Sequence, residues 1–341
     1  MSNVILDALS VVLVFFISGF ACGGIAKMMV PMAVSATPIN PETRRLLLGF
    51  FSGIGAALIW GGFPGISRLG IQGHLNQYDI TAIRYAVAGV ILAPVLIRRG
   101  FQGLPAGVIA MLACGAGAPY LLLAIGGLAF APAAHFGVVA PGTMLLISAL
   151  GGWLWMNDRL TVSRMIGSAV ILLGLLVMGW DGLHSPVVEG AWLGDCMFVA
   201  AGCAWAMFTL ASRRWSVDPL HATALVAVLS FVFYLPVYFW FFKFDAILAA
   251  APAEIGLQVG FQGILSAFVA LFLYSRGVQI LGAARGAVFA ALVPGFATIL
   301  AIPILAEWPT VLQATGVGLV TLGMIFALGL IRGRRAVSAS T

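Results

Sequence analysis

Residues 49–68 read GFFSGIGAALIWGGFPGISR, and this stretch decides the fold because the chain repeats it. Residues 194–213 read GDCMFVAAGCAWAMFTLASR, and an offset of 145 residues aligns six identical positions. In the first copy these positions are Gly49, Ala56, Trp60, Phe63, Ser67 and Arg68. Both copies are apolar and have about the 20 residues that a helix needs to cross a bilayer. The stretch therefore predicts a membrane-spanning helix that occurs twice.

The composition of the whole chain indicates the same class of protein. Of its 341 residues, 62% are apolar and only 8% are charged, whereas about 25% of residues are charged in soluble globular proteins. This excludes a cytosolic enzyme, a secreted disulfide scaffold and a disordered regulator. The four cysteines have no Cys-x-x-Cys spacing and lie in apolar stretches. We therefore expect no disulfide, no metal site and no cofactor.

Long apolar runs broken by charges, Pro and Gly predict ten spanning helices. They are expected at residues 46–69, 78–97, 106–128, 132–155, 161–180, 191–212, 220–242, 256–278, 284–306 and 310–331. A further apolar run at residues 4–30 precedes them, followed by a linker at 31–43. A signal peptide is the weakest interpretation of this run, because Asp7 precedes its apolar core and no Lys or Arg does. An eleventh helix, or a start at Met28, Met29 or Met32, stays open.

The later spans of each half also repeat, with an offset of 149 residues. This offset aligns Ala134, Gly137, Val139, Thr161, Gly167, Gly174 and Asp158 with Ala283, Gly286, Val288, Thr310, Gly316, Gly323 and Glu307. Each half has five spans, an odd number, so the two copies cross the membrane in opposite directions. We therefore expect an all-α integral membrane protein of two inverted five-helix repeats, which can open a shared site to each side in turn. The expected divisions are 1–43 (apolar segment and linker), 44–182 and 190–332 (repeats), and 333–341 (tail).

The distribution of basic residues supports this topology, because cytoplasmic loops carry an excess of Lys and Arg. With the start of the first main helix inside, only Arg68 and Lys243 fall outside. Thirteen arginines fall inside: Arg44, Arg45, Arg98, Arg99, Arg159, Arg164, Arg213, Arg214, Arg276, Arg285, Arg332, Arg334 and Arg335. The net charge of +6 is thus interpreted as topology, with no nucleic-acid partner. We expect a multi-pass membrane protein with a cytoplasmic C-terminus.

Polar and aromatic side chains inside the predicted spans form the candidate substrate site, because polar groups are energetically costly when they face lipid. The candidates are Trp60, Arg84, Tyr120, His135, Trp205, Gln262, Ser266 and Tyr274. Arg84 can hold a substrate carboxylate or fix a neighbouring helix. The two equivalent Trp residues can stack on a planar or cationic substrate, although packing between helices explains them equally well. His135 can titrate near neutral pH or serve as a hydrogen-bond partner.

Acidic residues mark several predicted helix ends. Asp158 and Glu307 each stand three residues before a Thr that can cap the next helix, so we interpret them as helix-junction acids. Thr310 and Gln313 have the spacing of a capping box. Asp195 lies only a turn into its helix, which favours an interfacial position over a buried proton relay.

Several short patterns resemble one known family. They are Ala57-Leu58-Ile59-Trp60-Gly61, Thr81-Ala82-Ile83-Arg84, Asp158-Arg159-Leu160-Thr161 and Glu307-Trp308-Pro309-Thr310, with Pro294 thirteen residues before Glu307. In this order they look like the EamA-type transporters of the drug/metabolite transporter superfamily, over residues 46–331. The resemblance implies a ten-helix inner-membrane carrier, often an exporter of amino acids or other small metabolites, with a cavity lined by the first, third, fourth, sixth, eighth and ninth helices. One departure is Leu145, which stands where the second half has Pro294.

The leading interpretation is a secondary transporter of a small-molecule substrate across the lipid bilayer. No Gly-x-x-x-x-Gly-Lys-Ser/Thr loop is present, so ATP is not the direct energy source; proton coupling and facilitated flux stay open. An integral membrane enzyme acting on a lipid or small molecule is the alternative, but the four His residues are scattered and form no His-Glu-x-x-His pattern. A channel would need charged rings or a filter-like loop. A homodimer also stays open.

Overall fold

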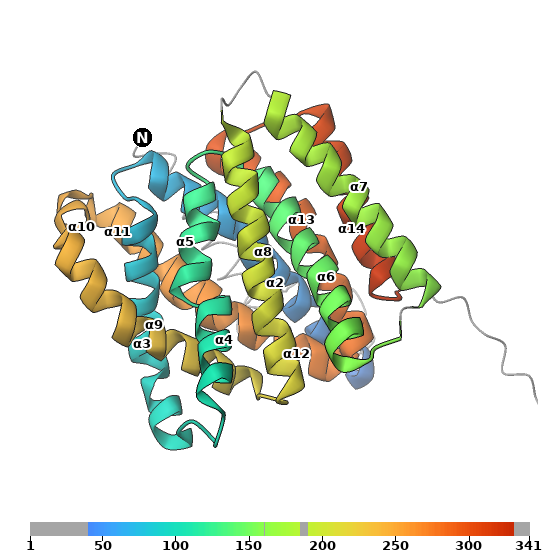
Figure 1. The fold of residues 1–341 in the computed structure, drawn as a ribbon, viewed down its shortest axis with the longest axis horizontal. Coiled ribbons are helices and arrows are strands. Elements are labelled where there is room, and N and C mark those ends of the chain that lie inside the picture. Colours follow the sequence, from blue (N-terminus) through green and yellow to red (C-terminus); the bar gives the residue numbers. More distant parts are fainter. Residues whose placement is uncertain (1–39, 160, 185–189, 331–341) are drawn as a thin grey trace, which may run out of the picture.

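The structure of the protein, a computed structural model, describes residues 40–159, 161–184 and 190–330. Within these ranges every regular element is a helix (Figure 1). The elements are α2 (Pro41–Gln72), α3 (Gln77–Arg99), α4 (Ala106–Ala116), α5 (Ala118–Gly127), α6 (Ala133–Met156), α7 (Val162–His184), α8 (Ala191–Arg214), α9 (Pro219–Phe242), α10 (Asp245–Ala249), α11 (Pro252–Gln258), the π-helix η2 (Val259–Val269), α12 (Ala270–Leu281), α13 (Ala283–Leu305) and α14 (Val311–Ala327). The apolar run at 4–30 and the tail at 333–341 lie outside the described residues.

The helices have the length and apolarity of membrane spans. In the described part of the chain, nine segments are long and apolar enough to cross a bilayer, with α4–α5 and α11–η2–α12 each counted as one. The shorter α14 is apolar as well. Each of the ten predicted spans falls on one of these segments. The prediction of an all-α membrane protein is confirmed.

Equivalent helices of the two halves run in opposite directions. In Figure 1, α2 runs upward through the bundle, whereas α8 starts near the top and runs downward. We call the end with the α2–α3, α5–α6 and α13–α14 connections the upper end, and the end with the α3–α4, α6–α7 and α8–α9 connections the lower end. These opposite directions agree with an odd number of spans in each half.

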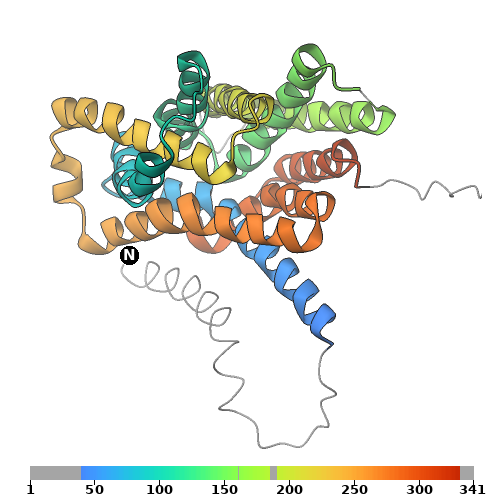
Figure 2. The same cartoon turned by 90° about the horizontal axis from the view of Figure 1, so that it is seen from below.

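The two halves are interleaved. α2 packs against α12 and α13 from the second half, and α8 packs against α4, α5 and α6 from the first. The pairs α3–α9 and α7–α14 form the two lateral edges (Figures 1 and 2). Because each half supplies the neighbours of the other half's first helix, the interface between them runs through the middle of the bundle.

Small residues allow α2 and α12 to approach closely. A Cβ atom on Gly277 would lie 3.2 Å from the carbonyl oxygen of Gly49 and 3.2 Å from the amide nitrogen of Gly53. Such contacts between backbones are typical of small-residue interfaces in membranes, where dispersion and packing drive helix association.

The third span is broken in its middle, between α4 and α5. Pro119 has no N–H and its ring crowds the carbonyl of the preceding turn, which favours a break there. The hydroxyl of Tyr85 on α3 donates to the carbonyl of Ala116 over 3.0 Å. The amide of Ala118 donates to the hydroxyl oxygen of Ser230 on α9 over 3.2 Å. The backbone groups released by the break therefore have partners, as irregular backbone at membrane depth requires.

The eighth span is irregular as well, because it contains the π-helix η2 between α11 and α12. The third and eighth spans are equivalent in the predicted repeat, so both irregular segments occupy the same place in their halves. η2 carries Gln262 and Ser266, two of the candidate site residues. Segments of π-helix occur frequently at functional sites.

Candidate functional site

Arg84 joins the second and eighth spans. Its helix α3 begins with a capping box between Asn76 and Asp79, which fixes the helix start at the upper end. The Nη1 of Arg84 donates to Oε1 of Gln262 over 3.2 Å and to the hydroxyl oxygen of Ser266 over 3.1 Å. The guanidinium thus meets the polar face of η2, and one of the two roles predicted for Arg84, the fixing of a neighbouring helix, matches this geometry.

The surroundings of Arg84 hold it while leaving donors free for a ligand. Gln262 is fully buried, and its Nε2 donates to the hydroxyl oxygen of Ser67 on α2 over 2.8 Å. The Cζ of Arg84 lies 5.9 Å from the centre of the Phe63 ring, within the range of a cation–π interaction. Arg84 itself is half-buried. Because its two described bonds use only Nη1, the guanidinium keeps donors that suit a carboxylate.

Two aromatic pairs occupy equivalent places in the two halves. Trp60 on α2 packs against Tyr274 on α12, with ring centroids 5.3 Å apart. Trp205 on α8 packs edge to face against Tyr120 on α5, with centroids 4.7 Å apart. The first pair joins spans one and eight, and the second joins the equivalent spans six and three. All four rings are half-buried, so each retains some accessible surface.

The predicted site residues therefore fall into separate groups. The structure brings Arg84, Gln262 and Ser266 into direct contact, and it pairs each Trp with a Tyr. His135 lies apart from them, in a different network at the upper end.

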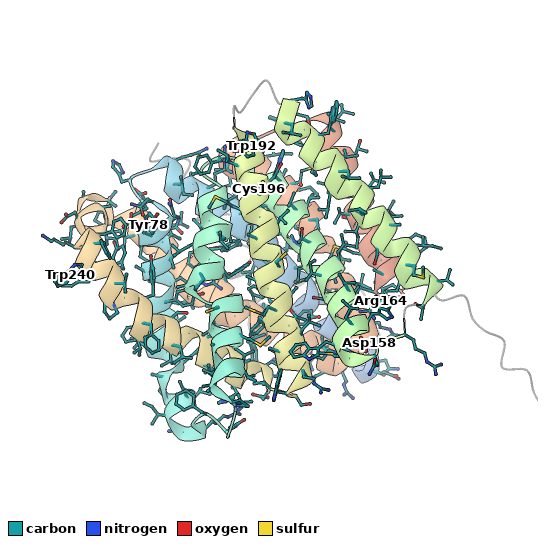
Figure 3. The ribbon with its side chains drawn as sticks, viewed as in Figure 1. Tyr78, Asp158, Arg164, Trp192, Cys196 and Trp240 are labelled. Atoms are coloured by element: carbon teal, nitrogen blue, oxygen red, sulfur yellow. The ribbon has the colours of Figure 1, made fainter. Side chains whose placement is uncertain are left out.

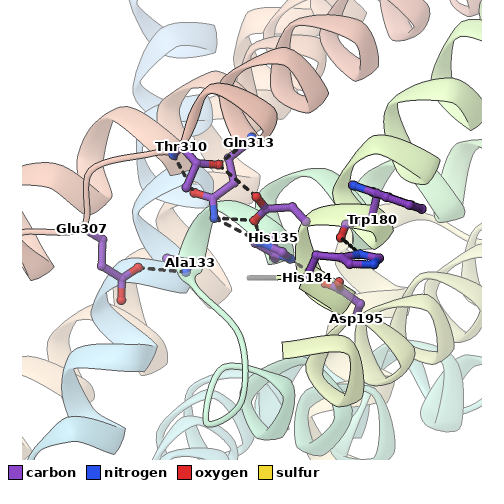
Figure 4. A network of polar contacts seen from close by, with 9 residues as sticks. Ala133, His135, Trp180, His184, Asp195, Glu307, Thr310 and Gln313 are labelled. Atoms are coloured by element: carbon purple, nitrogen blue, oxygen red, sulfur yellow. Dashed lines mark hydrogen bonds and ion pairs between the residues drawn. The ribbon is translucent and has the colours of Figure 1, made fainter. Parts of the chain in front are cut away.

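His135 is the centre of a buried polar cluster formed by four helices (Figure 4). Its Nδ1 lies 2.8 Å from Oδ1 of Asp195 on α8, and its Nε2 lies 3.1 Å from Oδ2 of Asp181 on α7. The Nε2 of Gln313 donates to the same oxygen of Asp181 over 2.9 Å. The hydroxyl of Thr310 donates to the other oxygen of Asp181 over 3.1 Å. We call these five residues the His135 cluster.

The His135 cluster corrects one prediction and supplies residues that the sequence analysis missed. Asp195 is buried, which the expectation of an interfacial position did not anticipate: it is 8% exposed and contacts His135. Its helix starts close to the α5–α6 connection, where a Cβ atom on the neighbouring Gly194 would lie 2.6 Å from that of Ala131. Asp181 was not predicted as a member of the cluster, because no local pattern connects it with His135. The predicted capping box of Thr310 and Gln313 is confirmed. It was the one local sequence pattern that involved members of the His135 cluster.

The helix-junction acids both bind arginines. Oε1 of Glu307 accepts from Nε of Arg68 over 2.5 Å at the upper end. At the lower end, Oδ1 of Asp158 accepts from Nη2 of Arg213 over 2.7 Å, and its Oδ2 lies 3.6 Å from Nη1 of Arg164. Figure 3 shows Asp158 and Arg164 side by side at this end. The hydrogen bond from Arg213 lowers the pKa of Asp158 below its ordinary value.

Both ion pairs join the two halves, but the upper pair makes additional contacts with the α5–α6 connection. Nη1 of Arg68 also donates to the carbonyls of Leu128, over 2.5 Å, and of Ala131, in the α5–α6 connection. Oε2 of Glu307 accepts from the amide of Ala133 over 3.1 Å. For Arg213, the hydrogen bond found in the described part of the chain is the one to Asp158. We call the contacts of Arg68 and Glu307 with residues 128–133 the upper latch.

A cavity with a volume of about 250 Å³ opens beside the upper latch. Its lining includes both latch residues and reaches the His135 cluster at two side chains. The lining residues are Arg68, Pro132, Ala134, Thr298, Ala301, Ala306, Glu307, Trp308, Pro309, Thr310 and Gln313. The cavity therefore links the latch, the start of α6 and the edge of the cluster.

The fold and these sites define a class: a multi-pass membrane protein with polar and aromatic groups at the interface of two interleaved halves. Among the described residues, no group of three or more His, Cys, Asp or Glu side chains is placed to hold a metal ion. The chain belongs to the EamA-like transporter family, which it matches over residues 47–180 and 192–329. It is a membrane transporter by this membership.

Two similar proteins agree with this assignment. "Uncharacterized transporter YetK" of Bacillus subtilis (strain 168) is 23% identical over 270 residues, which make up 76% of this chain and 81% of YetK. A solved structure described as "Crystal structure of protein" has a TM-score of 0.57 and 19% sequence identity, over 85% of this chain and 99% of that one. At this identity, the second similarity shows the fold alone.

Proposed function

We propose that the protein is a secondary transporter that exports a small metabolite, such as an amino acid, by alternating access between two inverted repeats at 44–182 and 190–332. The observation that carries this proposal is the equivalence of two ion pairs, Arg68–Glu307 and Arg213–Asp158, at opposite ends of the bundle. Repeats that exchange conformations can make and release equivalent contacts in turn.

The two pairs differ in a way that supports alternation. The Arg68 side chain is 12% exposed and extends onto the α5–α6 connection, whereas the Arg213 side chain is 51% exposed. Both pairs join the two halves, but the upper pair is more buried and also holds the α5–α6 connection, so the upper end is latched more extensively than the lower end. Release of the upper latch, with closure at the lower end, would give the opposite state.

The substrate would bind in the middle of the bundle, between the two aromatic pairs and Arg84. The half-buried rings of Trp60 and Trp205 offer flat apolar walls, and the guanidinium of Arg84 offers donors to a carboxylate. A small molecule with a carboxylate and an apolar or planar part fits this chemistry.

The lower end would face the cytoplasm of a cell with this protein in its inner membrane. The described part of the chain carries ten basic residues on the lower loops or the helix ends next to them: Arg44, Arg45, Arg98, Arg99, Arg159, Arg164, Arg213, Arg214, Arg276 and Arg285. The upper end has Arg68 and Lys243. By the excess of positive charge on cytoplasmic loops, the upper end is external and the C-terminus is cytoplasmic.

Transport can be tested with the purified protein in liposomes. We would measure uptake of a panel of radiolabelled amino acids and nucleobases, with and without a pH gradient, and resistance of expressing cells to toxic analogues of the same compounds. The proposal predicts saturable uptake of at least one compound, reduced in Arg84→Gln but not in Arg285→Gln, which changes an exposed arginine. No saturable uptake for any compound, with unchanged resistance in cells, would contradict it.

A further inference from the structure

The His135 cluster holds three ionisable groups away from water. His135 is 0% exposed, Asp181 is 5% exposed and Asp195 is 8% exposed. They come from α6, α7 and α8, near the upper end of each helix. Ionisable residues inside membrane spans are energetically costly and commonly mark functional sites, so a buried group of three needs an explanation.

The contacts of the imidazole ring fix the number of protons in the cluster. Both ring nitrogens face a carboxylate oxygen, at 2.8 Å and 3.1 Å. Gln313 Nε2 also lies 3.3 Å from the ring Nε2. A neutral imidazole can donate from only one nitrogen, so hydrogen bonds to both carboxylates require that the ring is an imidazolium or that one carboxyl carries a proton. With this proton, the charges of the imidazole ring and the two carboxyl groups sum to −1. Binding of one additional proton makes the cluster neutral.

Asp195 offers a place for the additional proton. Its Oδ2 is buried and has no hydrogen-bond partner in the described part of the chain. It packs against Gly182 of α7, where a side chain would collide with it. A buried carboxylate oxygen without a donor is less costly as part of a neutral carboxyl than as part of an anion.

The other charged groups near the start of α6 do not neutralise the cluster. Arg68 of α2 and Glu307 of the α13–α14 connection pair with each other. His184 on α7 is exposed, and its Nδ1 lies 3.1 Å from the carbonyl of Trp180 (Figure 4). The described residues of α5, α13 and α14 contribute no ionisable side chain to the cluster.

Water can reach the edge of the cluster from the upper end. Thr310 and Gln313, both bonded to Asp181, line the 250 Å³ cavity. The same cavity is lined by Glu307, which accepts from the amide of Ala133, two residues before His135. A change of charge on the cluster therefore acts on the same turn of α6 that the upper latch holds.

We propose that His135, Asp181 and Asp195 form a proton-binding site, reached from the upper cavity, whose occupancy controls the upper latch. This rests on the proposed transport function, in which a proton entering from the outside is exchanged for a substrate molecule leaving the cell. Binding of the proton neutralises the cluster and loosens its hold on the start of α6. Release of the proton restores the negative charge and the hold of the cluster on the start of α6.

Proton binding can be tested without knowing the substrate. The protein has four histidines, so the ring nitrogens of His135 can be assigned by NMR with ¹⁵N-labelled histidine in lipid nanodiscs, using His135→Gln as the reference spectrum. We expect the His135 signals to show a titration step between about pH 5 and 8. The step should vanish or move in Asp195→Asn and stay in Glu254→Gln. The latter removes the carboxylate of the other His–acid pair at this end, whose His74 is exposed.

The coupling can be tested with the panel compound that the wild-type protein transports. A gradient of about one pH unit supports roughly tenfold accumulation on the acidic side for each proton exchanged. Asp195→Asn should lose this accumulation but keep exchange of labelled for unlabelled compound, and Glu254→Gln should keep both. A His135 signal that does not change with pH in the wild type, or accumulation that survives in Asp195→Asn, would overturn the proton site while leaving transport intact. Absence of all transport with an intact NMR step would overturn the proposed function instead.

Discussion

The Nε of Arg68 donates to Oε1 of Glu307 over 2.5 Å, at positions equivalent to those of Arg213 and Asp158 in the other half. The same acid–arginine pair thus occurs at both ends of the bundle, yet only the upper one extends onto the α5–α6 connection. This asymmetry is what a protein built from equivalent halves shows when one end is latched.

Removal of the latch arginine should open the upper end. Hydrogen bonds to charged groups contribute about 1.5–3 kcal/mol, so Arg68→Gln should shift the equilibrium toward the open state by roughly tenfold or more. Thr298 lines the upper cavity and is 6% exposed, so it can report on opening. In a background with the native cysteines replaced, Thr298→Cys should react faster with an external, impermeant maleimide when Arg68→Gln is present.

The control for this measurement is Arg213→Gln, which removes the equivalent arginine at the lower end. It should not accelerate labelling of Thr298→Cys. Equal labelling rates in all three proteins would show that the ion pair does not hold the upper end closed.

A carboxylate placed beside Arg84 should inhibit transport without unfolding the protein. In Gln262→Glu, the new carboxylate would pair with the guanidinium and occupy the donors assigned to the substrate. We expect transport of carboxylate substrates to fall by about tenfold, equivalent to about 1.4 kcal/mol. Gln279→Glu, an exposed change on α12, should transport normally. If Gln262→Glu keeps wild-type transport, Arg84 has a structural role and does not bind the substrate.

Much of the fold follows from the sequence because the bilayer imposes it. A run of about 20 apolar residues must be a helix in lipid, so the ten spans were predictable from local composition. The capping box of Thr310 and Gln313 was predictable as well, because it depends on residues only three apart.

The candidate site was less predictable, since it depends on contacts between distant residues. Asp181 and Asp195 follow His135 by 46 and 60 residues along the chain. No local pattern indicates that three helices bring these residues together. The pairing of Arg68 with Glu307 spans 239 residues. The internal repeat aligns Arg68 with Arg213 and Glu307 with Asp158, but it could not show that Arg68 contacts Glu307.

The break in the third span should depend on its hydroxyl partner. Tyr85→Phe leaves the carbonyl of Ala116 without its 3.0 Å donor, which should lower the free energy of unfolding by about 1–2 kcal/mol. Tyr78→Phe, at an exposed position on the same helix, is the matched control. Thermal unfolding in detergent would compare the two variants. Equal stability would mean that another group or water satisfies this carbonyl.

The lower ion pair should give a small acid-dependent contribution to stability. Because Arg213 lowers the pKa of Asp158 in the folded protein, the folded state binds fewer protons than the unfolded state at this group. Its stabilisation is complete above the ordinary carboxyl pKa of about 4 and is lost as the pH falls through the lowered value. Asp158→Asn should therefore reduce stability at neutral pH and show a shallower loss at acidic pH than the wild type. Parallel curves for both proteins would contradict this assignment.

The most direct test of alternating access is to lock the upper end chemically. Pro132 and Glu307 face the same cavity from opposite sides of the latch, so Pro132→Cys with Glu307→Cys can be joined by a short, reducible crosslinker. Substrate flux in liposomes would be measured before crosslinking, after it and after reduction, with the Pro132→Cys and Glu307→Cys single variants, which cannot be crosslinked, as the controls. The account predicts that the upper crosslink abolishes flux and that reduction restores it, while the same reagent leaves flux through the single-cysteine variants intact. Undiminished flux through protein with its upper end crosslinked would contradict alternating access.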